Sequence, residues 1–520
     1  MTGKLSALSE KYDHKVKTLD ELREILGPWP RARKVILCHG VFDVVHPGHL
    51  RHLLYAKGKA DILVASLTAD RHISKGLYRP HVPQELRALN LAAFEFVDYV
   101  IIDPEAKPLR TLDRLQPDFY AKGYEYVSGG LPPKTQEEVE LVQGYGGEVI
   151  FTPGDHVLSS SRLIDLQPPS LKYDKLLTLM DGERLTFDDL RGTLERLRGL
   201  RVHVVGDTIV DSYTQTAMIG GQTKTPTVSV LYQGREDFVG GAGIVAKHLR
   251  AAGAEVVFST VLGDDALKDF VLEDLAGAGV RCQPIVDATR PTTQKNAIVA
   301  GGYRLLKIDT LDNRSISDEI VERLVRTIRT EPADAVVFSD FRHGVFNRRT
   351  IPFLTGAIAD GVFKVADSQV ASRWGNITEF QGFDLITPNE REARFALGDQ
   401  DSGIRPLASE IYDTARCRML ILKLGEKGVL TCRNPNHEAI DSFFVVDSFV
   451  DRVVDAVGAG DALLAYATLS MLASGSTVVA SILGSMAAAL ECEVDGNHPI
   501  TPAGLLARID TVENACQFRS

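Results

Sequence analysis

Two short segments of this chain combine residue types that can handle phosphate groups. Near one end, an apolar stretch from Val35 leads into His46-Pro-Gly-His49, and near the other end Asp455-Ala-Val-Gly-Ala-Gly-Asp461 precedes a run of small apolar residues. Each segment is expected to lead into a helix. Helix N-termini attract phosphate because their first N–H groups are unpaired and the helix dipole is positive there. The pattern therefore predicts two phosphate-handling sites on one polypeptide.

The first segment suits nucleotidyl transfer. His46 and His49 stand at the start of a helix expected from near Leu50, where both imidazoles can donate to one phosphoryl group. The α-phosphate of a nucleoside triphosphate gains negative charge as a sugar phosphate attacks it, and preorganised donors stabilise that charge. We therefore predict His46 and His49 as catalytic residues. The alternative, two surface histidines beside a turn, is disfavoured by the motifs around them.

The second segment suits phosphoryl transfer to a hydroxyl. The backbone N–H groups of Gly458, Ala459 and Gly460 are expected to close around a migrating γ-phosphoryl group. Asp461 is then the predicted base, which accepts the proton of the attacking hydroxyl. The alternative is a helix cap after a glycine-rich turn, and the neighbouring motifs decide against it.

Residues 33–166 resemble the cytidylyltransferase-like nucleotidyltransferases. The motif His39-Gly-Val-Phe-Asp43 precedes the paired histidines as in that family, and the later family motifs follow in order up to Ser159-Ser-Ser-Arg-Leu163. The resemblance implies a Rossmann-like α/β domain whose last motif opens a helix that holds triphosphate. It assigns nucleotide and phosphate binding to Gly40, Phe42, Asp43, Gly48, Lys75, Arg87, Lys122, Gly123, Ser159, Ser160 and Ser161.

Residues 200–505 resemble the ribokinase-like sugar kinases. The motifs, in the order of that family, are Val202-His-Val-Val-Gly-Asp207, Val239-Gly-Gly-Ala-Gly243, Thr387-Pro-Asn-Glu-Arg-Glu392 and Lys423-Leu-Gly-Glu-Lys-Gly428. The resemblance implies an α/β domain with a small β lid. It assigns the sugar site to Asp207, Asp211, Gly240, Gly241 and Asp340. It assigns nucleotide and phosphate binding to Asn389, Glu392, Lys423, Gly425, Gly428, Gly458, Ala459 and Gly460. No side-chain motif for a metal is evident, and the resemblance implies that Glu392 helps to organise Mg²⁺.

Together the two halves are similar to the bifunctional heptose-7-phosphate kinase/heptose-1-phosphate adenylyltransferases of bacterial surface-sugar synthesis, with the domain order reversed. The resemblance implies ADP-heptose synthesis from ATP with Mg²⁺: phosphorylation at the anomeric hydroxyl, then nucleotidyl transfer to a sugar 1-phosphate with release of pyrophosphate. A heptose 1,7-bisphosphate must lose one phosphate between these steps. Direct channelling is therefore not implied.

Three positions depart from the heptose-kinase pattern. Ile244 stands where the family usually has an Asn, and an apolar side chain cannot hydrogen-bond a sugar hydroxyl. His343 and Gln369 replace lysines that are expected to meet a substrate phosphate. These changes are compatible with a different or unphosphorylated sugar, with compensation by Arg342 or Arg373, or with a weakened kinase.

Two other functions fit the same motifs. One is a CTP-dependent nucleotidyltransferase for another sugar or polyol phosphate, fused to a sugar kinase of different specificity. The other is a nucleotidyltransferase fused to a kinase fold that survives only as a sugar-sensing module. The motifs leave the sugar, the nucleobase, the oligomeric state and the end product open.

Bulk composition excludes several classes of protein. With 44% hydrophobic and 24% charged residues in 520, the chain resembles an ordinary soluble protein of two or three domains. Its net charge of −11 argues against nucleic acid as a partner. Six scattered cysteines without C-x-x-C spacing argue against a zinc site or a disulfide framework. No signal peptide or membrane span is evident, so we expect a cytoplasmic protein that acts on small molecules.

Hydrophobic patterning predicts α/β alternation in both halves, with mostly parallel sheets. Paired prolines in Leu166-Gln-Pro-Pro-Ser170 predict the boundary. We expect a nucleotidyltransferase domain at 1–168, a linker at 169–185 and a kinase domain at 186–520. Two segments, 214–233 and 290–307, are expected to form the lid, through which we expect a homodimer.

Overall fold

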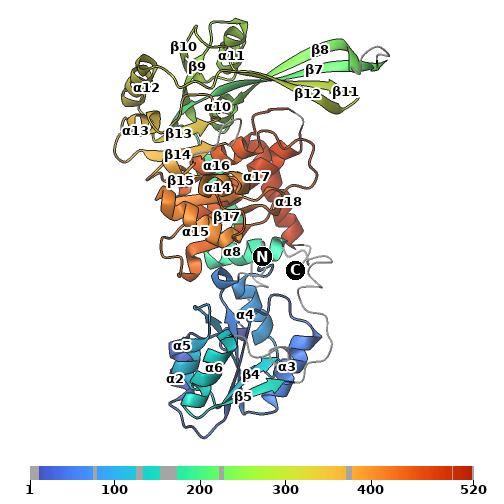
Figure 1. Cartoon of the computed structure of the whole chain (residues 1–520), viewed down its shortest axis with the longest axis vertical. Coiled ribbons are helices and arrows are strands. Elements are labelled where there is room, and N and C mark those ends of the chain that lie inside the picture. Colours follow the sequence, from blue (N-terminus) through green and yellow to red (C-terminus); the bar gives the residue numbers. More distant parts are fainter. Residues whose placement is uncertain are drawn as a thin grey trace. The chain divides into compact units, whose positions relative to one another are not determined.

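A computed structural model of the chain describes residues 11–73, 79–123, 133–152, 172–221, 228–369, 377–494 and 496–517. It divides into two compact units. The first comprises residues 1–185 with the short segments 436–440 and 515–520, and the second comprises 186–435 and 441–514. Most of the first unit is blue to cyan in Figure 1, and most of the second runs from green to red.

The first unit is built on a five-stranded parallel sheet in the order β3-β2-β1-β4-β5. The strands are β1 (Val35–Gly40), β2 (Ile62–Thr68), β3 (Tyr99–Asp103), β4 (Phe119–Gly123) and β5 (Glu148–Thr152). They alternate with α2 (Leu19–Leu26), α3 (Pro47–Lys57), α4 (Gln84–Ala92), α5 (Leu109–Leu115) and α6 (Pro133–Gly144). The strand order reverses between β1 and β4. Doubly wound sheets bind ligands beyond the carboxyl ends of the strands at such a point.

Both faces of this sheet are covered. Ile36 and Cys38 of β1 pack into one hydrophobic cluster, whereas Val35 and Leu37 pack into the other. A continuous apolar strand is expected wherever helices lie on both faces of a parallel sheet. Cys38 is therefore a core residue.

The second unit contains a nine-stranded sheet in the order β10-β9-β6-β13-β14-β15-β16-β17-β18. Strands β10 to β16 pair in parallel, and β17 and β18 are antiparallel. Its strands are β6 (Arg201–Gly206), β9 (Glu255–Leu262), β10 (Arg281–Val286), β13 (Ala335–Asp340), β14 (Phe363–Ser368), β15 (Leu385–Ile386), β16 (Met419–Lys423), β17 (Val429–Cys432) and β18 (Phe443–Val446). The helices are α9 (Phe187–Glu195), α10 (Ala242–Ala251), α11 (Ala266–Gly277), α12 (Asp318–Thr330), α13 (Thr350–Thr355), α14 (Glu390–Leu397), α15 (Ile404–Ala415), α16 (Ala459–Ser474), α17 (Thr477–Cys492) and α18 (Pro502–Gln517).

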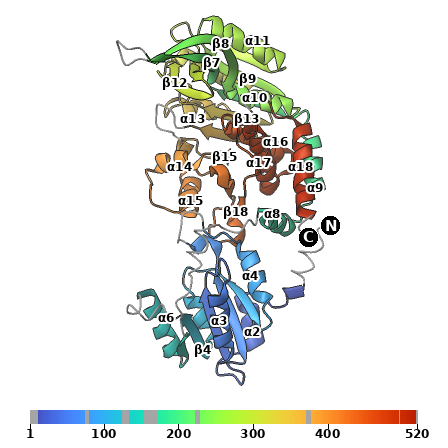
Figure 2. The same ribbon diagram turned by 90° about the vertical axis from the view of Figure 1, so that its right-hand side faces the viewer.

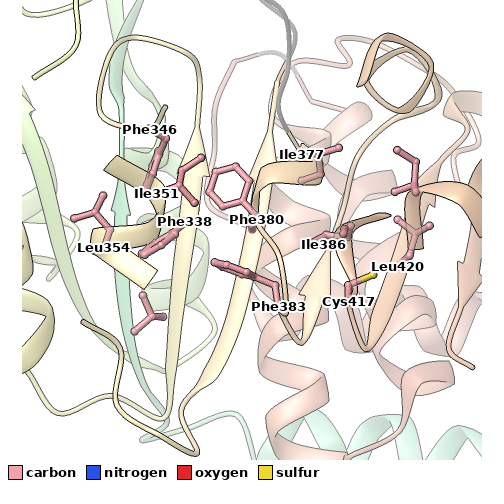
Figure 3. Packing of buried hydrophobic residues seen from close by; sticks show 14 of the residues in the cluster. Phe338, Phe346, Ile351, Leu354, Ile377, Phe380, Phe383, Ile386, Cys417 and Leu420 are labelled. Carbon is pink, nitrogen blue, oxygen red and sulfur yellow. The ribbon is translucent and has the colours of Figure 1, made fainter. Parts of the chain in front are cut away.

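A cluster of phenylalanines holds one face of this sheet against its helices (Figure 3). Phe338 of β13 packs against Phe346, Phe380 and Phe383 with ring centroids 5.0 to 6.3 Å apart. All four rings are buried. The cluster fixes the central strands, whose carboxyl ends carry the kinase motifs.

A separate four-stranded sheet forms the predicted lid. Its order is β12-β11-β7-β8, with long strands β7 (Thr208–Gly221) and β8 (Val228–Gly241) and shorter strands β11 (Gln294–Ala300) and β12 (Tyr303–Thr310). These strands project from the body of the unit (Figure 1). The lid strands begin near Thr208, six residues before the predicted start, because the motif at Asp211 is itself part of the sheet.

The segment predicted as a linker holds a helix. Helix α8 spans Lys172–Gly182 with Leu176 and Met180 buried, and it belongs to the first unit. The second unit begins with α9, where Thr186 and Asp189 form a capping box. Helix α9 lies beside α18 (Figure 2), and Arg191 donates to Asp510 and Glu513. Within the described ranges, no helix has the length and apolar character needed to cross a membrane.

Candidate functional site

In the first unit, the paired histidines stand at the N-terminus of α3. Pro47 is the first helical residue, and the N–H of Gly48 donates to His46 Nδ1 at 3.0 Å. The ring centroids of His46 and His49 are 4.1 Å apart, and the Phe42 ring packs on His49 at 5.2 Å. The helix begins three residues earlier than predicted, because proline is favoured at the first helical position. The two imidazoles are thus side by side where phosphate is attracted.

These histidines lie among other partly buried imidazoles. Burial, and then the neighbouring His46 and His52, lower the pKa of His49 to about 4. Burial and Lys122 lower the pKa of His52 to about 4, and its Nδ1 lies 2.8 Å from the hydroxyl of Thr152. His52 was not predicted from the sequence. Its spacing of three residues from His49 was the available signal, because such spacing places both on one helix face.

The carboxyl ends of β1, β2 and β4 add further polar groups. The ring of His39 lies 2.9 Å from Ser66 Oγ and 3.2 Å from Thr68 Oγ1, and burial lowers its pKa to about 3. Lys122 Nζ lies 2.6 Å from a carboxylate oxygen of Glu138. These groups meet at the β1/β4 reversal of the strand order, beside the helix that carries His46 and His49.

Asp43 and Arg87, predicted to bind nucleotide or phosphate, brace loops in this structure. Asp43 is buried and accepts from the backbone N–H groups of His81 and Val82 at 2.8 and 2.9 Å. The side chain of Arg87 is fully buried. Its guanidinium donates to the backbone carbonyls of Val41, Thr68 and Val82 and to the carboxylate of Asp70. A fully buried side chain with this many protein partners favours a structural role over a phosphate contact.

The remaining predictions for this unit divide into two groups. Gly40 ends β1, Gly48 lies in the first turn of α3, and Gly123 ends β4. A Cβ on Gly40 would lie 3.2 Å from the Phe42 ring, so little space is available there. Lys75, Ser159, Ser160 and Ser161 lie outside the described residues.

In the second unit, a cavity of about 1060 Å³ gathers most of the kinase predictions. Its wall includes the lid, the ends of the central strands and the glycine loop before α16. The predicted residues that line it are Asp211, Gly241, Asn389, Glu392, Lys423, Gly425, Gly428, Gly458, Ala459, Gly460 and Asp461. Residues 250 positions apart in the sequence, Asp211 and Asp461, therefore share one cavity.

Asp461 stands in the first turn of α16, which begins after Gly458 in the left-handed conformation (φ 83°). The carboxylate is buried, and its Oδ1 has no hydrogen-bond partner among the described residues. Burial, and then Asp367, raise its pKa well above the ordinary value, while Lys423 opposes the rise. An unpartnered buried oxygen at a helix N-terminus is suited to accept a proton from a bound hydroxyl.

Lys423 provides the positive charge next to this base. Its Nζ donates to Asp367 at 2.9 Å, and a Cβ on Gly460 would lie 3.2 Å from it. Burial alone would lower the pKa of Lys423, but Asp367 and Glu392 outweigh that effect and raise it. The lysine is therefore charged beside the loop expected to hold the γ-phosphoryl group.

Asn389 and Glu392 form a reciprocal cap at the start of α14. The Asn389 side chain accepts from the N–H of Glu392 at 2.8 Å, and Glu392 accepts from the N–H of Asn389 at 2.7 Å. Burial raises the pKa of Glu392, against the effect of Lys423. No cluster of three or more His, Cys, Asp or Glu suited to a metal occurs in the part of the chain that is described. Glu392 fits a supporting role for an Mg²⁺ ion carried by nucleotide phosphates, because Mg²⁺ takes few protein oxygens in such sites.

The end of the cavity next to the lid, where the motifs predict the sugar and which is called the sugar end below, is arranged around Asp211 of β7. Its Oδ2 accepts from Asn497 Nδ2 at 3.1 Å, and a Cβ on Gly240 would lie 2.1 Å from that oxygen. Gly241 has φ 61°, which favours glycine at the turn into α10. The diglycine therefore allows the backbone to approach Asp211. Asn497 was not among the residues predicted from the sequence.

Asp207 and Asp340, predicted to bind sugar, form part of the buried framework. Asp207 accepts from the backbone N–H groups of Phe341 and His343 at 3.0 and 3.2 Å, and Asp340 accepts from Ser368 Oγ at 2.8 Å. Burial, and then Asp340, raise the pKa of Asp207. Neither belongs to the described cavity lining. Their contacts brace the loop after β13, which favours a structural role over direct contact with a sugar.

The structure also locates the three residues that depart from the heptose-kinase pattern. Ile244 is fully buried on α10, and His343 is buried with Nδ1 2.9 Å from Asn313 Oδ1. Arg342 donates to Asp340, and Gln369 lines the cavity. Arg373 lies outside the described residues. The described cations at the sugar end are instead Lys295, Arg304 and Lys307, which line the cavity from the lid.

Comparison with known proteins identifies both units. Residues 200–503, more than half of the chain, match the family model of the pfkB family carbohydrate kinases, and residues 37–166 match that of the cytidylyltransferase-like proteins. The α/β fold class, both domain classes and their order along the chain are thereby confirmed.

Curated relatives carry the name bifunctional protein HldE. One from Rhodopseudomonas palustris (strain TIE-1) is 31% identical over 337 residues, which cover 62% of this chain and 66% of that protein. One from Desulfatibacillum aliphaticivorans is 29% identical over 328 residues, covering 61% and 65%. The chain thus spans just under two thirds of the length of these relatives.

Solved structures support the fold of the kinase unit. Phosphofructokinase-2 from Escherichia coli in complex with fructose-6-phosphate matches with a TM-score of 0.50 and 15% identity, over 60% of this chain and 99% of that one. The same enzyme with substrates and products matches with a TM-score of 0.50, 16% identity, and coverage of 60% and 100%. The chain therefore belongs to the pfkB family of carbohydrate kinases and carries a cytidylyltransferase-like domain ahead of its kinase domain.

Proposed function

We propose that this chain is a bifunctional transferase that makes a nucleotide-activated sugar. The kinase unit phosphorylates a sugar phosphate at its anomeric hydroxyl with ATP, and the first unit transfers a nucleotidyl group to a sugar 1-phosphate and releases pyrophosphate. The observation that carries the proposal is the unpartnered Oδ1 of buried Asp461, at a helix N-terminus in the cavity that also holds Asp211 and Lys423.

In the kinase reaction, Asp211 orients the sugar and Asp461 accepts the proton of the attacking hydroxyl. The N–H groups at the start of α16 hold the transferred phosphoryl group. Lys423, beside Gly460, supplies a fixed positive charge to that group. Mg²⁺ bound with the nucleotide would neutralise phosphate charge, with Glu392 in support.

In the nucleotidyl transfer, His46 and His49 donate to the phosphate that is attacked. Their ring centroids lie 4.1 Å apart at the start of α3, so both can face one phosphoryl group. The triphosphate's negative charge raises the pKa of a nearby imidazole and so opposes the lowering by burial. The oxygen of the sugar 1-phosphate then forms a bond to the α-phosphorus as pyrophosphate leaves.

The lid supports an anionic acceptor. Lys295 is the register partner of Asp211, and Ala297, two residues on, is that of Lys307 in β12. Both lysines therefore lie on the lid face that lines the cavity, and Asp309 is the acidic residue opposite Lys295. Burial, and then Lys307, lower the pKa of Lys295. Two lysines that repel one another at the sugar end suit a phosphate on the acceptor.

The finer assignment is heptose 7-phosphate as acceptor and ADP-heptose as product. It is supported by the order of motifs and by the relatives named bifunctional protein HldE. The second candidate is a different sugar phosphate, or CTP in place of ATP, and the exchange of family lysines for His343 and Gln369 favours it.

The lid also supports a homodimer. Every residue of β12 is exposed, although half of them are apolar. Large apolar side chains gather on the lid: Met218, Ile219, Leu231, Tyr232, Tyr303, Leu306 and Ile308. Exposed apolar surface of this kind marks an interaction site. Leu306→Asp should convert a dimer to a monomer in light scattering, and a monomeric parent protein would contradict the proposal.

The experiment that tests the function is a Mg²⁺-dependent screen with ATP or CTP against heptose 7-phosphate and heptose 1-phosphate in separate reactions, resolved by mass spectrometry. A bisphosphate from the first and a nucleotide-linked heptose from the second are the expected products. Nucleotide sugar without bisphosphate would leave the kinase acceptor to be found among other sugars. Neither product would overturn the heptose assignment.

A further inference from the structure

Asn497 lies between the two halves of the kinase cavity. It belongs to the segment between α17 and α18, is 5% exposed and lines the cavity. Its Nδ2 donates to Asp211 Oδ2 at 3.1 Å. Its Oδ1 has no hydrogen-bond partner among the residues that the structure describes. The amide nitrogen is therefore hydrogen-bonded, whereas the amide oxygen has no donor among the described residues.

The contacts of the amide fix which way it faces. A carboxylate only accepts hydrogen bonds, so the amide must turn its NH₂ group to Asp211 and its oxygen away. A Cβ on Gly240 would lie 3.0 Å from Nδ2, and a Cβ on Gly458 would lie 3.0 Å from Oδ1. Asn497 thus spans from the sugar-site diglycine to the glycine loop of phosphoryl transfer.

A buried amide oxygen without a donor costs free energy unless a ligand supplies one. Sugar hydroxyls are such donors, and Asp211 beside it offers a second acceptor. We propose that Asn497 is a specificity-determining residue of the acceptor site, where its Oδ1 accepts from one hydroxyl of a vicinal diol and Asp211 accepts from the next. This inference rests on the proposed kinase function.

The position of Asn497 also explains how the site retains an amide. Ile244, after the diglycine, is apolar and fully buried on α10, outside the described cavity lining. The side chain that supplies an amide beside Asp211 comes instead from 286 residues further along the chain. The hydrogen-bond acceptors of the proposed sugar site, Asp211 and Asn497, therefore come from opposite ends of the kinase sequence.

The test compares Asn497→Ala and Asn497→Asp with the parent protein. Loss of the amide should raise KM for the sugar about 10-fold, and a second carboxylate beside Asp211 should raise it on the order of 100-fold. KM for ATP and the nucleotidyl transfer should stay unchanged. The Asp side chain has nearly the same size and shape as that of Asn, so Asn497→Asp can still be measured if Asn497→Ala fails to fold.

A substrate-side comparison separates recognition from a merely structural role. The parent enzyme should prefer heptose 7-phosphate to one of its monodeoxy analogues by about 10-fold, and Asn497→Ala should lose that preference. Asn313→Ala, which removes a half-buried amide outside the described cavity lining, is the matched control and should keep it.

The outcomes are distinct. An active parent whose preference survives in Asn497→Ala would overturn the role of Asn497 and leave the kinase intact. A parent that phosphorylates neither the heptose phosphate nor its analogues would overturn the kinase proposal, and the role of Asn497 with it.

Discussion

The two phosphate-handling regions use titratable groups of opposite kinds. In the first unit the buried groups are bases, and burial lowers the pKa values of His49 and His52 to about 4. In the second unit they are acids, and burial raises the pKa values of Asp461 and Glu392. The same physical cause, desolvation, disfavours the charged form of these four groups, whereas Lys423 of the second unit stays charged because Asp367 and Glu392 outweigh its burial.

This difference indicates how the charge of each substrate changes the protonation state of the groups around it. A neutral imidazole becomes cationic most readily beside the negative charge of a triphosphate. A protonated carboxyl group becomes a carboxylate, and so a base, beside Lys423 and a metal-bound nucleotide. In each site, the charge of the bound ligand is therefore expected to bring the titratable groups into the charged form that the reaction needs.

The largest test of this comparison is Asp461→Asn. The amide cannot accept the hydroxyl proton, so kcat of the kinase should fall on the order of 10³-fold. Nucleotidyl transfer, measured on the same preparation with heptose 1-phosphate, should be unchanged. Loss of both activities would show that the two units are obligately coupled.

His49→Gln tests the nucleotidyl-transfer site of the first unit. Gln retains one donor but cannot become cationic, so nucleotidyl transfer should fall on the order of 10²-fold while sugar phosphorylation stays intact. His14→Gln, at an exposed histidine of the same unit, is the control. Equal losses in both variants would contradict a specific role for His49.

A smaller effect is expected from the lid lysines. The double variant Lys295→Gln, Lys307→Gln should raise KM for a phosphorylated acceptor on the order of 10-fold, because each lysine contributes a charged contact. KM for the same sugar without phosphate should change little. Arg235→Gln, on lid strand β8 outside the described cavity lining, controls for the integrity of the lid. Equal changes for both sugars would show that the lysines do not recognise phosphate.

The sequence predicted the fold and the two helix-terminal motifs because these are local. Continuous apolar strands, the proline after His46 and the glycines before Asp461 act within a few residues of one another. Asn497 was not predicted, because its partner Asp211 lies 286 residues away and no local pattern links them. Only the topology of the kinase unit brings the two together.

Family motifs also did not separate contact with ligand from support of the backbone. Arg87, Asp207 and Asp340 match motif positions, yet their described partners are loop N–H groups, carbonyls and neighbouring side chains. A motif shows that a residue type is required at a position. Burial and hydrogen bonding are needed to tell which role requires it.

The smallest expected effect is on the stability of the protein. Its dependence on pH has opposite sign for a buried group of each unit. Burial raises the pKa of Glu491, which is fully buried behind Gly458, to about 8. The unfolded chain ionises this group from pH 4.5 upward, but the folded chain keeps it protonated up to about pH 8. The stability of the parent therefore falls as pH rises through that window.

Glu491→Gln removes this loss, so its Tm advantage over the parent should grow by on the order of 5 °C between pH 5 and pH 8 and then level off. His49→Gln should show the reverse trend. The folded-state pKa of His49 is about 4 and the ordinary value is 6.5, so the parent loses stability as pH falls between these values and the variant's advantage is greatest at low pH. Thermal unfolding of the full chain, with Glu322→Gln at an exposed position as control, measures both trends. Parallel pH trends for the two variants would contradict the opposed charge states on which the comparison depends.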